Sequence, residues 1–245
     1  MQVYGVMVSE QPNVRPLRRL IIGGKSVAVP FPVIAWEDHG GLSLRDIGCA
    51  DTRTDPTGSR VDLLVLHWDG CRSSHECHRV LVERGLSAHL LIDGDGAVYQ
   101  TLDLAMDRAW HAKGFNDRSI GIEIQNPVQL NRRCAHEEIG RRAVTEAVAH
   151  KKHSLWTHWD FTALQKGRVV QLVGAINQLF GIPSKVPMEG ERVASSLIDP
   201  TFRGVCGHYH LSPHKQDPGH SLWPLIQQTL LASDRDQEAE QPSEL

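Results

Sequence analysis

Residues 61–70 read Val-Asp-Leu-Leu-Val-Leu-His-Trp-Asp-Gly. Val61 to Leu66 is an apolar run of the length of one β-strand, typical of a strand buried on both faces of a sheet. His67 follows this run directly, at the carboxyl end of the expected strand. Ligand sites of α/β folds form beyond such strand ends, so His67 either serves a site or bonds a backbone carbonyl in the interior.

Strand and helix patterns alternate along the rest of the chain. Ser73 or Ser74 is suited to cap a helix that ends near Gly85. Further strands are expected at 88–92, 97–100, 119–125 and 204–208, and further helices at 162–180 and 221–231. This order favours an α/β fold with a central β-sheet flanked by helices.

The segment Ser-Ile-Gly-Ile-Glu-Ile-Gln at 119–125 alternates strictly between isoleucine and other residues. Successive side chains of a strand point to opposite faces, so the isoleucines share one face. Glu123 is therefore expected on the opposite face, away from the apolar side.

Composition excludes several classes of partner. The chain has 245 residues and a formal net charge of −3 at pH 7, which gives no basic field for nucleic acid or an anionic membrane. No apolar run approaches the roughly 20 residues of a membrane span, and no segment has the features of a signal peptide. The five cysteines lack a CxxC spacing and predict neither a disulfide framework nor a zinc finger. We expect synthesis in the cytoplasm; the oligomeric state is left open.

Three regions are expected along the chain. Residues 1–58 are rich in proline and predict an irregular N-terminal arm of short strands and loops. Residues 59–232 carry the strand and helix patterns of the main domain. Residues 233–245 are rich in acidic residues and glutamine, which predicts a disordered tail.

Residues 207–219 read Gly-His-Tyr-His-Leu-Ser-Pro-His-Lys-Gln-Asp-Pro-Gly. Asp217 precedes a proline and is biased to an extended backbone, so Lys215 and Asp217 can project to the same side. Two imidazoles and a carboxylate, with a fourth position left to water, form a catalytic zinc arrangement. The alternative is a simple Asp-Pro-Gly turn with solvated histidines.

Four stretches, taken together, resemble one family. They are Leu-His-Trp-Asp-Gly at 66–70, the segment 86–100, the segment Ala-Trp-His-Ala to Ile-Glu-Ile at 109–124, and the loop 207–219. In this order they resemble the type 2 N-acetylmuramoyl-L-alanine amidases, the family of phage lysozyme-like amidases and peptidoglycan recognition proteins. The resemblance extends from about residue 61 to residue 224.

The resemblance implies a mixed sheet and one zinc ion (Zn2+) per chain. It places the metal ligands on His67, His208 and Asp217, and the active-site glutamate and lysine on Glu123 and Lys215. The second histidine is assigned to His208 because it follows a glycine at the end of an apolar strand. His210 is the alternative. The residues expected to contact substrate are Trp110, His111, Asn116 and Arg118.

These residue types suit the chemistry of amide hydrolysis. Zinc lowers the pKa of a bound water from 15.7 to about 7. Glu123 is suited to accept the proton of that water and pass it to the leaving amine. Lys215 offers a positive charge to the developing oxyanion.

The predicted function is therefore zinc-dependent cleavage of the bond between N-acetylmuramic acid and L-alanine, with peptidoglycan or muropeptides as the partner. A recognition domain that binds peptidoglycan without cutting it is the alternative. An unrelated zinc peptidase is a further one, although the chain lacks an H-E-x-x-H motif. A lysin, a recycling enzyme and an exported effector remain open as biological roles, with a preference for the lysin or effector.

Overall fold

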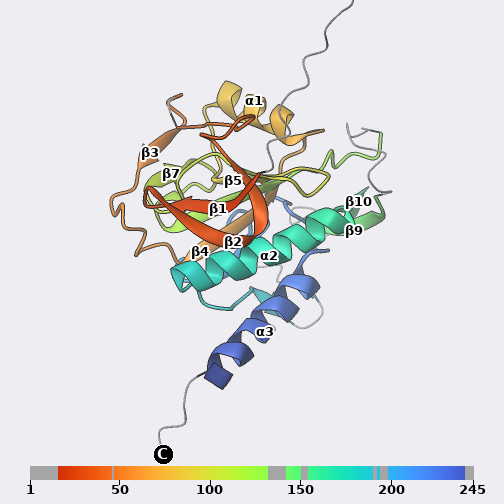
Figure 1. The fold of residues 1–245 in the computed structure, drawn as a ribbon. Coiled ribbons are helices and arrows are strands. Elements are labelled where there is room, and N and C mark those ends of the chain that lie inside the picture. The colour runs from red at the N-terminus through yellow and green to blue at the C-terminus, as the bar shows by residue number, and fades with distance from the viewer. Residues whose placement is uncertain are drawn as a thin grey trace, which may run out of the picture.

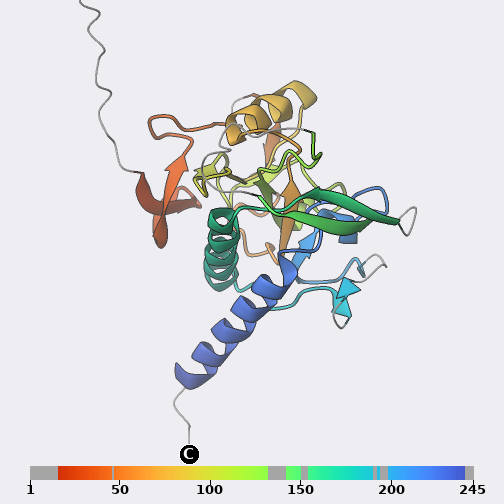
Figure 2. The same cartoon turned by 90° about the vertical axis from the view of Figure 1, so that its right-hand side faces the viewer.

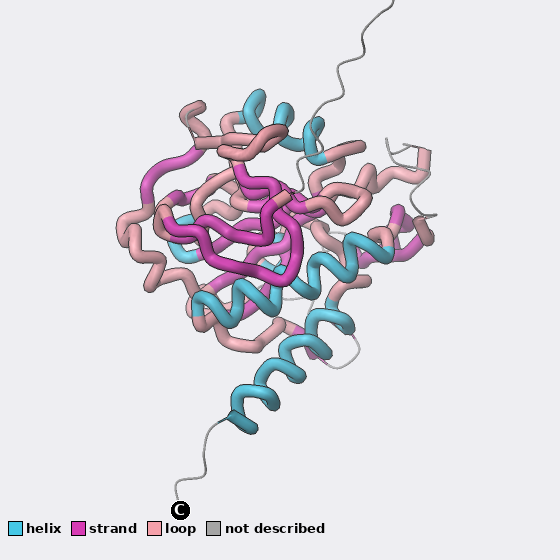
Figure 3. Tube along the Cα trace, viewed as in Figure 1, coloured by secondary structure: helices cyan, strands magenta, loops and turns pink. Residues whose placement is uncertain are grey.

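A computed structural model describes residues 16–45, 47–131, 142–149, 154–189, 192–193 and 198–240. Its centre is a seven-stranded sheet, seen as the magenta layer between the helices (Figure 3). In spatial order the strands are β1 (Leu17–Ile22), β2 (Lys25–Ala35), β6 (Val98–Gln100), β5 (Leu90–Ile92), β8 (Ser119–Ile124), β4 (Leu63–Trp68) and β13 (Gly204–Gly207). The pairs β1–β2 and β5–β6 are antiparallel and the other pairs are parallel, so the sheet is mixed, as expected.

Three α-helices flank the sheet (Figure 1): α1 (Ser74–Arg84) lies on one side, and α2 (Ala163–Phe180) and α3 (Trp223–Glu240) lie on the other. Side chains of α2 and α3 share a hydrophobic cluster with the isoleucines of β8. Side chains of α1 pack in a second cluster with Leu91 of β5. This is the expected α/β arrangement.

Local capping signals fix where the helices begin and end. Ser73 caps α1 by accepting a hydrogen bond from the backbone N–H of Glu76, and Gly85 ends the helix in the left-handed conformation at φ 62°. Thr162 and Gln165 form a reciprocal capping box at the start of α2. Both helices therefore follow the boundaries predicted from the sequence.

Strand alternation divides β4 and β8 into two faces. Leu64 and Leu66 of β4 lie in the large cluster with α2 and α3. The intervening residues of β4 pair with Ser119, Gly121 and Glu123 of β8, in the register Leu63↔Ser119, Val65↔Gly121 and His67↔Glu123. The polar residues of both strands consequently share the α1 side of the sheet.

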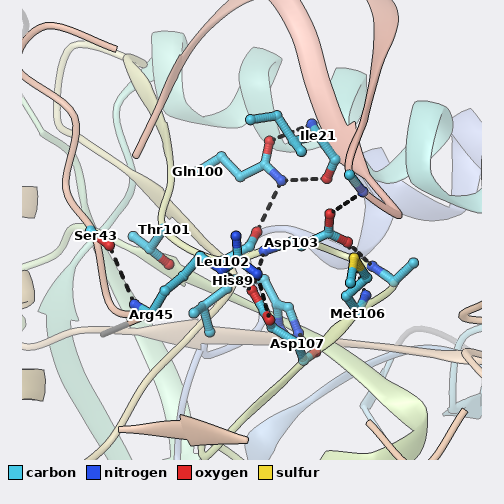
Figure 4. A network of polar contacts seen from close by, with 12 residues as sticks. Ile21, Ser43, Arg45, His89, Gln100, Thr101, Leu102, Asp103, Met106 and Asp107 are labelled. Atoms are coloured by element: carbon cyan, nitrogen blue, oxygen red, sulfur yellow. Dashed lines mark hydrogen bonds and ion pairs between the residues drawn. The ribbon is translucent and has the colours of Figure 1, made fainter. Parts of the chain in front are cut away.

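The segment expected as an irregular arm contributes two strands to the central sheet. β1 and β2 form a hairpin, and β2 joins β6 through the pairs Ile34↔Tyr99 and Ala35↔Gln100. The side chain of Gln100 bonds both the N–H and the carbonyl of Ile21, at 2.8 and 2.7 Å (Figure 4). Prolines at 30 and 32 obscured the strand pattern in the sequence, because proline cannot donate to a sheet ladder.

A carboxylate holds the turn of the same hairpin. Asp103 accepts hydrogen bonds from the backbone N–H groups of Gly23 and Gly24, at 2.9 and 2.7 Å. Both glycines have positive φ, which the tight turn requires. The hairpin is thus tied to the main body at its turn as well as along its edge.

The remaining elements are small. They are β3 (Ala50–Thr52) with β7 (Asp107–Ala109), β9 (Val144–Ala149) with β10 (Ser154–Trp159), β11 (Met188–Glu189) with β12 (Arg192–Val193), and the short 3-10 helices η1 (Asn116–Arg118) and η3 (His208–His210). The β9–β10 hairpin, which the sequence patterns did not predict as strands, projects from the body (Figure 2).

Helix α3 extends beyond its expected end at residue 231 and continues to Glu240. Residues 233–240 of the segment expected as a disordered tail are therefore helical, whereas 241–245 lie outside the described residues. Extending an existing helix needs no new nucleation, and the alanine, glutamine and glutamate here are good helix formers. Among the described residues, no helix is long and apolar enough to cross a membrane.

Candidate metal centre and active site

Two adjacent parallel strands bring two histidines together. His67 lies near the carboxyl end of β4, and His208 follows β13 directly. The two strands pair through Gly207↔Leu66, so the histidines leave the sheet at the same edge. The loop after His208 returns to this edge, because the N–H of Tyr209 donates to the carbonyl of Asp217 at 3.0 Å.

Nitrogen and oxygen atoms converge at this point. Nδ1 of His67 lies 2.9 Å from Oδ2 of Asp217, and Nδ1 of His208 lies 3.0 Å from the same oxygen. All three residues are buried, and their ligand-type atoms lie within 4.8 Å of one another. Two imidazole nitrogens and one carboxylate oxygen fit a zinc ion that keeps a fourth position open.

His210, the alternative ligand, faces elsewhere. Its Nδ1 accepts a hydrogen bond from the backbone N–H of Gly207 at 2.9 Å. Its ring packs against Tyr209, with the ring centroids 3.9 Å apart. Of the two candidates, His208 is therefore the histidine that faces Asp217.

Glu123 lies beside these three residues. It is paired with His67 across β4 and β8, and it lines a pocket of about 240 Å³ together with His67, His208, Lys215 and Asp217. Its buried Oε2 has no hydrogen-bond partner among the described residues. Burial raises the pKa of Glu123 well above its usual value, and the negative charges of Asp217 and Asp69 add to this effect. Burial and these charges therefore favour the protonated form of Glu123 more than water would.

The protonation states of the cluster suit a metal. Burial, together with the neighbouring His208, lowers the pKa of His67 to about 4. Burial alone would raise the pKa of Asp217, but hydrogen bonds from His208 and His67 hold it below its usual value. A neutral imidazole and an ionised carboxylate are the forms in which these side chains bind metals.

Two of the four residues expected to contact substrate lie at the pocket. Trp110 and His111 both line it. The indole Nε1 of Trp110 donates to Asp51 at 3.1 Å, which fixes this side chain at the pocket wall. His111 contacts His67 directly, with Nδ1 3.0 Å from Nε2 of His67.

The other two residues hold loops and do not line the pocket. Asn116 accepts hydrogen bonds from the backbone N–H groups of His111 and Ala112. Arg118 donates to the carbonyl of Phe202 at 2.6 Å and forms an ion pair with Asp62. A contact of Asn116 or Arg118 with substrate stays a prediction without support from these positions.

A second polar cluster, which sequence reasoning missed, lines the same pocket. The carboxylate of Asp69 and the thiols of Cys71 and Cys77 lie within 4.8 Å of one another. Oδ1 of Asp69 already accepts hydrogen bonds from the N–H groups of Cys71 and Asn126. Asp69 and Cys71 lie close to His67 in the sequence, and this could have indicated that they belong to the same site. A search for CxxC spacing does not detect them.

The chain is similar to several solved structures. The hydrolase AmiA of Staphylococcus aureus, solved with its ligand, is 13% identical with a TM-score of 0.54, and the match covers 85% of this chain and 87% of that one. The N-acetylmuramoyl-L-alanine amidase LysC of Clostridium intestinale is 12% identical with a TM-score of 0.48, covering 82% of this chain and 98% of that one. A comparison with curated protein sequences found no match.

The family comparison covers most of the folded body. The model of the family described as N-acetylmuramoyl-L-alanine amidase matches residues 57–220, which include β4, β8, β13 and the cluster at their carboxyl ends. Because this match spans more than half of the chain, the chain belongs to the N-acetylmuramoyl-L-alanine amidases, a family of peptidoglycan hydrolases.

Proposed function

We propose that this chain hydrolyses the amide bond between N-acetylmuramic acid and L-alanine of the stem peptide, with one zinc ion held by His67, His208 and Asp217. The observation that carries the proposal is the convergence of two imidazole Nδ1 atoms on one carboxylate oxygen, beside Glu123, whose buried Oε2 has no hydrogen-bond partner among the described residues. A zinc ion bound there would act as a Lewis acid and lower the pKa of a coordinated water.

Glu123 is the proposed general base and acid. Its carboxylate accepts a proton from the attacking water, whose oxygen bonds to the lactyl carbonyl carbon. The same proton passes to the nitrogen of L-alanine as the carbon–nitrogen bond breaks, so the products are a free lactyl carboxyl group and a free amine. The position of Glu123 supports this role, because its buried Oε2 has no hydrogen-bond partner among the described residues and it lines the same pocket as His67, His208 and Asp217.

Lys215 is proposed to stabilise the negative charge that develops on the carbonyl oxygen. It lines the pocket that contains His67 and Glu123. A fixed positive charge in a partly desolvated pocket stabilises an oxyanion more strongly than the same charge does in water. Trp110 forms part of the pocket wall and is proposed to contact the sugar or the stem peptide.

The test is a digest of peptidoglycan by purified protein, after treatment with a chelator and again after zinc is restored. We expect stem peptides that begin with L-alanine, identified by mass spectrometry, lost with the chelator and recovered with zinc. Fragments cut within the stem peptide would instead identify a peptidase. Binding of zinc and muropeptide without any cleavage would identify a recognition domain.

The same digest addresses where the enzyme acts. We propose that it acts on the cell wall, as a lysin or an exported effector, and therefore cuts intact sacculi. Activity on soluble muropeptides with none on sacculi would contradict this assignment and favour a recycling enzyme.

A further inference from the structure

A chain of three side chains leads away from the proposed zinc site. Nε2 of His67 lies 3.0 Å from Nδ1 of His111, and Nε2 of His111 lies 3.1 Å from Oγ of Ser119. The other nitrogen of His67 faces Asp217. The chain therefore begins at a proposed metal ligand and ends at a hydroxyl group at the first residue of β8.

The backbone of β8 leaves room for the imidazole ring of His111. A Cβ atom on Gly121 would lie 2.6 Å from Cγ and Nδ1 of His111, so only a glycine lets the imidazole rest against the strand. Ser119 and Gly121 are paired with Leu63 and Val65 of β4, on the face of the sheet that carries His67 and Glu123. Asn116 accepts a hydrogen bond from the backbone N–H of His111 at 3.2 Å.

Hydrogen-bond logic allows two arrangements of protons along this chain. A neutral imidazole has one donor and one acceptor, whereas a hydroxyl group can both donate and accept. When His67 donates from Nδ1 to Asp217, His111 must donate to Nε2 of His67, and Ser119 must donate to His111. When Nδ1 of His67 binds a metal, Nε2–H donates to His111, and His111 donates to Ser119.

We propose that His111 and Ser119 are positioning residues that hold His67 in the metal-binding tautomer through a hydrogen-bond chain that reverses when the metal binds. This inference rests on the proposed zinc site. It assigns His111 a contact with the metal-binding residue His67, in place of the substrate contact expected from the sequence. Ser119 is the required end of the chain, because its hydroxyl satisfies Nε2 of His111 in both arrangements. Partners of this kind orient ligands, and their loss typically weakens metal affinity about 10–100-fold.

The first test measures the zinc dissociation constant by competition with a fluorescent chelator. We expect Ser119→Ala and His111→Phe to weaken zinc binding about 10–100-fold. His111→Gln keeps one donor and one acceptor, and we expect it to bind zinc more tightly than His111→Phe. The matched control is Ser74→Ala, which removes a buried hydroxyl that has no hydrogen-bond partner among the described residues.

The second test reads the tautomers directly by ¹⁵N NMR of the imidazole nitrogens. In the wild type we expect the proton of His67 to move from Nδ1 to Nε2 when zinc is added. Ser119→Ala removes the partner of Nε2 of His111 in both arrangements, so we expect the balance between the two arrangements to shift from that of the wild type, an effect that a merely structural loss of stability would not produce. Wild-type zinc affinity and unchanged tautomers in Ser119→Ala would overturn the proposal. If the wild type bound no zinc, the proposed metal site would be wrong. The tautomers of His67 and His111 in the metal-free protein would still test the hydrogen-bond chain to Ser119.

Discussion

Glu123 enters the pocket because strand alternation turns it away from Ile122 and Ile124, which lie in the core. Its buried oxygen has no partner among the described residues, so the site holds this carboxyl group at a cost in stability. Such a cost is expected where function, and not packing, selects the residue.

The first prediction concerns catalysis by Glu123→Gln. The amide cannot accept a proton, so we expect kcat/KM on muropeptides to fall about 100- to 10,000-fold, the usual contribution of general acid–base catalysis. Zinc content should stay at the wild-type level, because Glu123 is outside the ligand set. The matched control is Glu83→Gln on the exposed surface of α1, which should leave both quantities unchanged. Activity of Glu123→Gln within tenfold of wild type would exclude Glu123 as the base.

The second prediction concerns the pH dependence of stability in the metal-free protein. The pKa of Glu123 is raised in the folded state above its usual value of 4.5, so both states are protonated at lower pH and no penalty exists. As the pH rises above that value, the unfolded chain loses its proton first, and the folded state is destabilised. Glutamine does not titrate. In chelator-treated samples, Glu123→Gln should therefore melt at a higher temperature than wild type at pH 7–8, and this difference should disappear once the pH falls below the usual value of 4.5. A difference that is the same at both pH values would contradict the raised pKa.

The sequence predicts the positions of those residues that follow from strand patterns. His67 and His208 each sit at the end of an apolar strand, and Glu123 sits on the polar face of an alternating one. It could not place Asn116 and Arg118, whose neighbourhood depends on a 3-10 helix and on the loop near Phe202. Contacts of that kind depend on distant parts of the chain, and no local pattern encodes them.

At the start of α2, the side chain of Thr162 makes two hydrogen bonds. The hydroxyl of Thr162 accepts from the N–H of Gln165 at 3.1 Å and donates to the carbonyl of Gly94 at 2.8 Å. It thereby caps the helix and also ties it to the turn between β5 and β6. The sequence predicts a helix that begins at residue 162, but it does not predict this second bond, because residue 94 is distant along the chain.

We predict that Thr162→Ala lowers the free energy of unfolding by about 1–2 kcal/mol, from the loss of the cap and of one buried hydrogen bond. Urea denaturation followed by circular dichroism measures this change. Thr229→Ala in α3 is the control, since that hydroxyl donates to the carbonyl of Leu225, four residues earlier in the same helix, and alanine favours helix. Equal losses in the two variants would show that the cap contributes nothing specific.

Whole strands were harder to predict than helix boundaries. The β9–β10 hairpin and the prolines of β2 do not give the regular alternation by which a strand is recognised. The β1–β2 hairpin also gains its order from outside, through the edge of β6 and the side chain of Gln100. The place of the β1–β2 hairpin in the sheet therefore depends on contacts with distant parts of the chain, which local sequence patterns do not predict.

That role bears on the domain boundary predicted between residues 58 and 59. Leu20, Val29, Phe31 and Val33 of the hairpin are buried in the same core cluster as the strands that carry the site. Burying each such side chain contributes about 1.5–3 kcal/mol, so their combined loss is comparable with the roughly 5–15 kcal/mol of net stability of a typical domain. Removing β2 would also leave the edge of β6 unpaired and open to association.

We predict that residues 59–245 expressed alone do not fold cooperatively, although they include every proposed catalytic and metal-binding residue. A variant of residues 36–245, which lacks only β1, β2 and what precedes them, should fail in the same way, because the loss of the hairpin is the shared cause. Differential scanning calorimetry against the full chain measures this, with dye binding as a report of exposed apolar surface. If residues 59–245 melted in one cooperative transition within a few degrees of the full chain, the hairpin would be an appendage, and the boundary at residue 59 would stand.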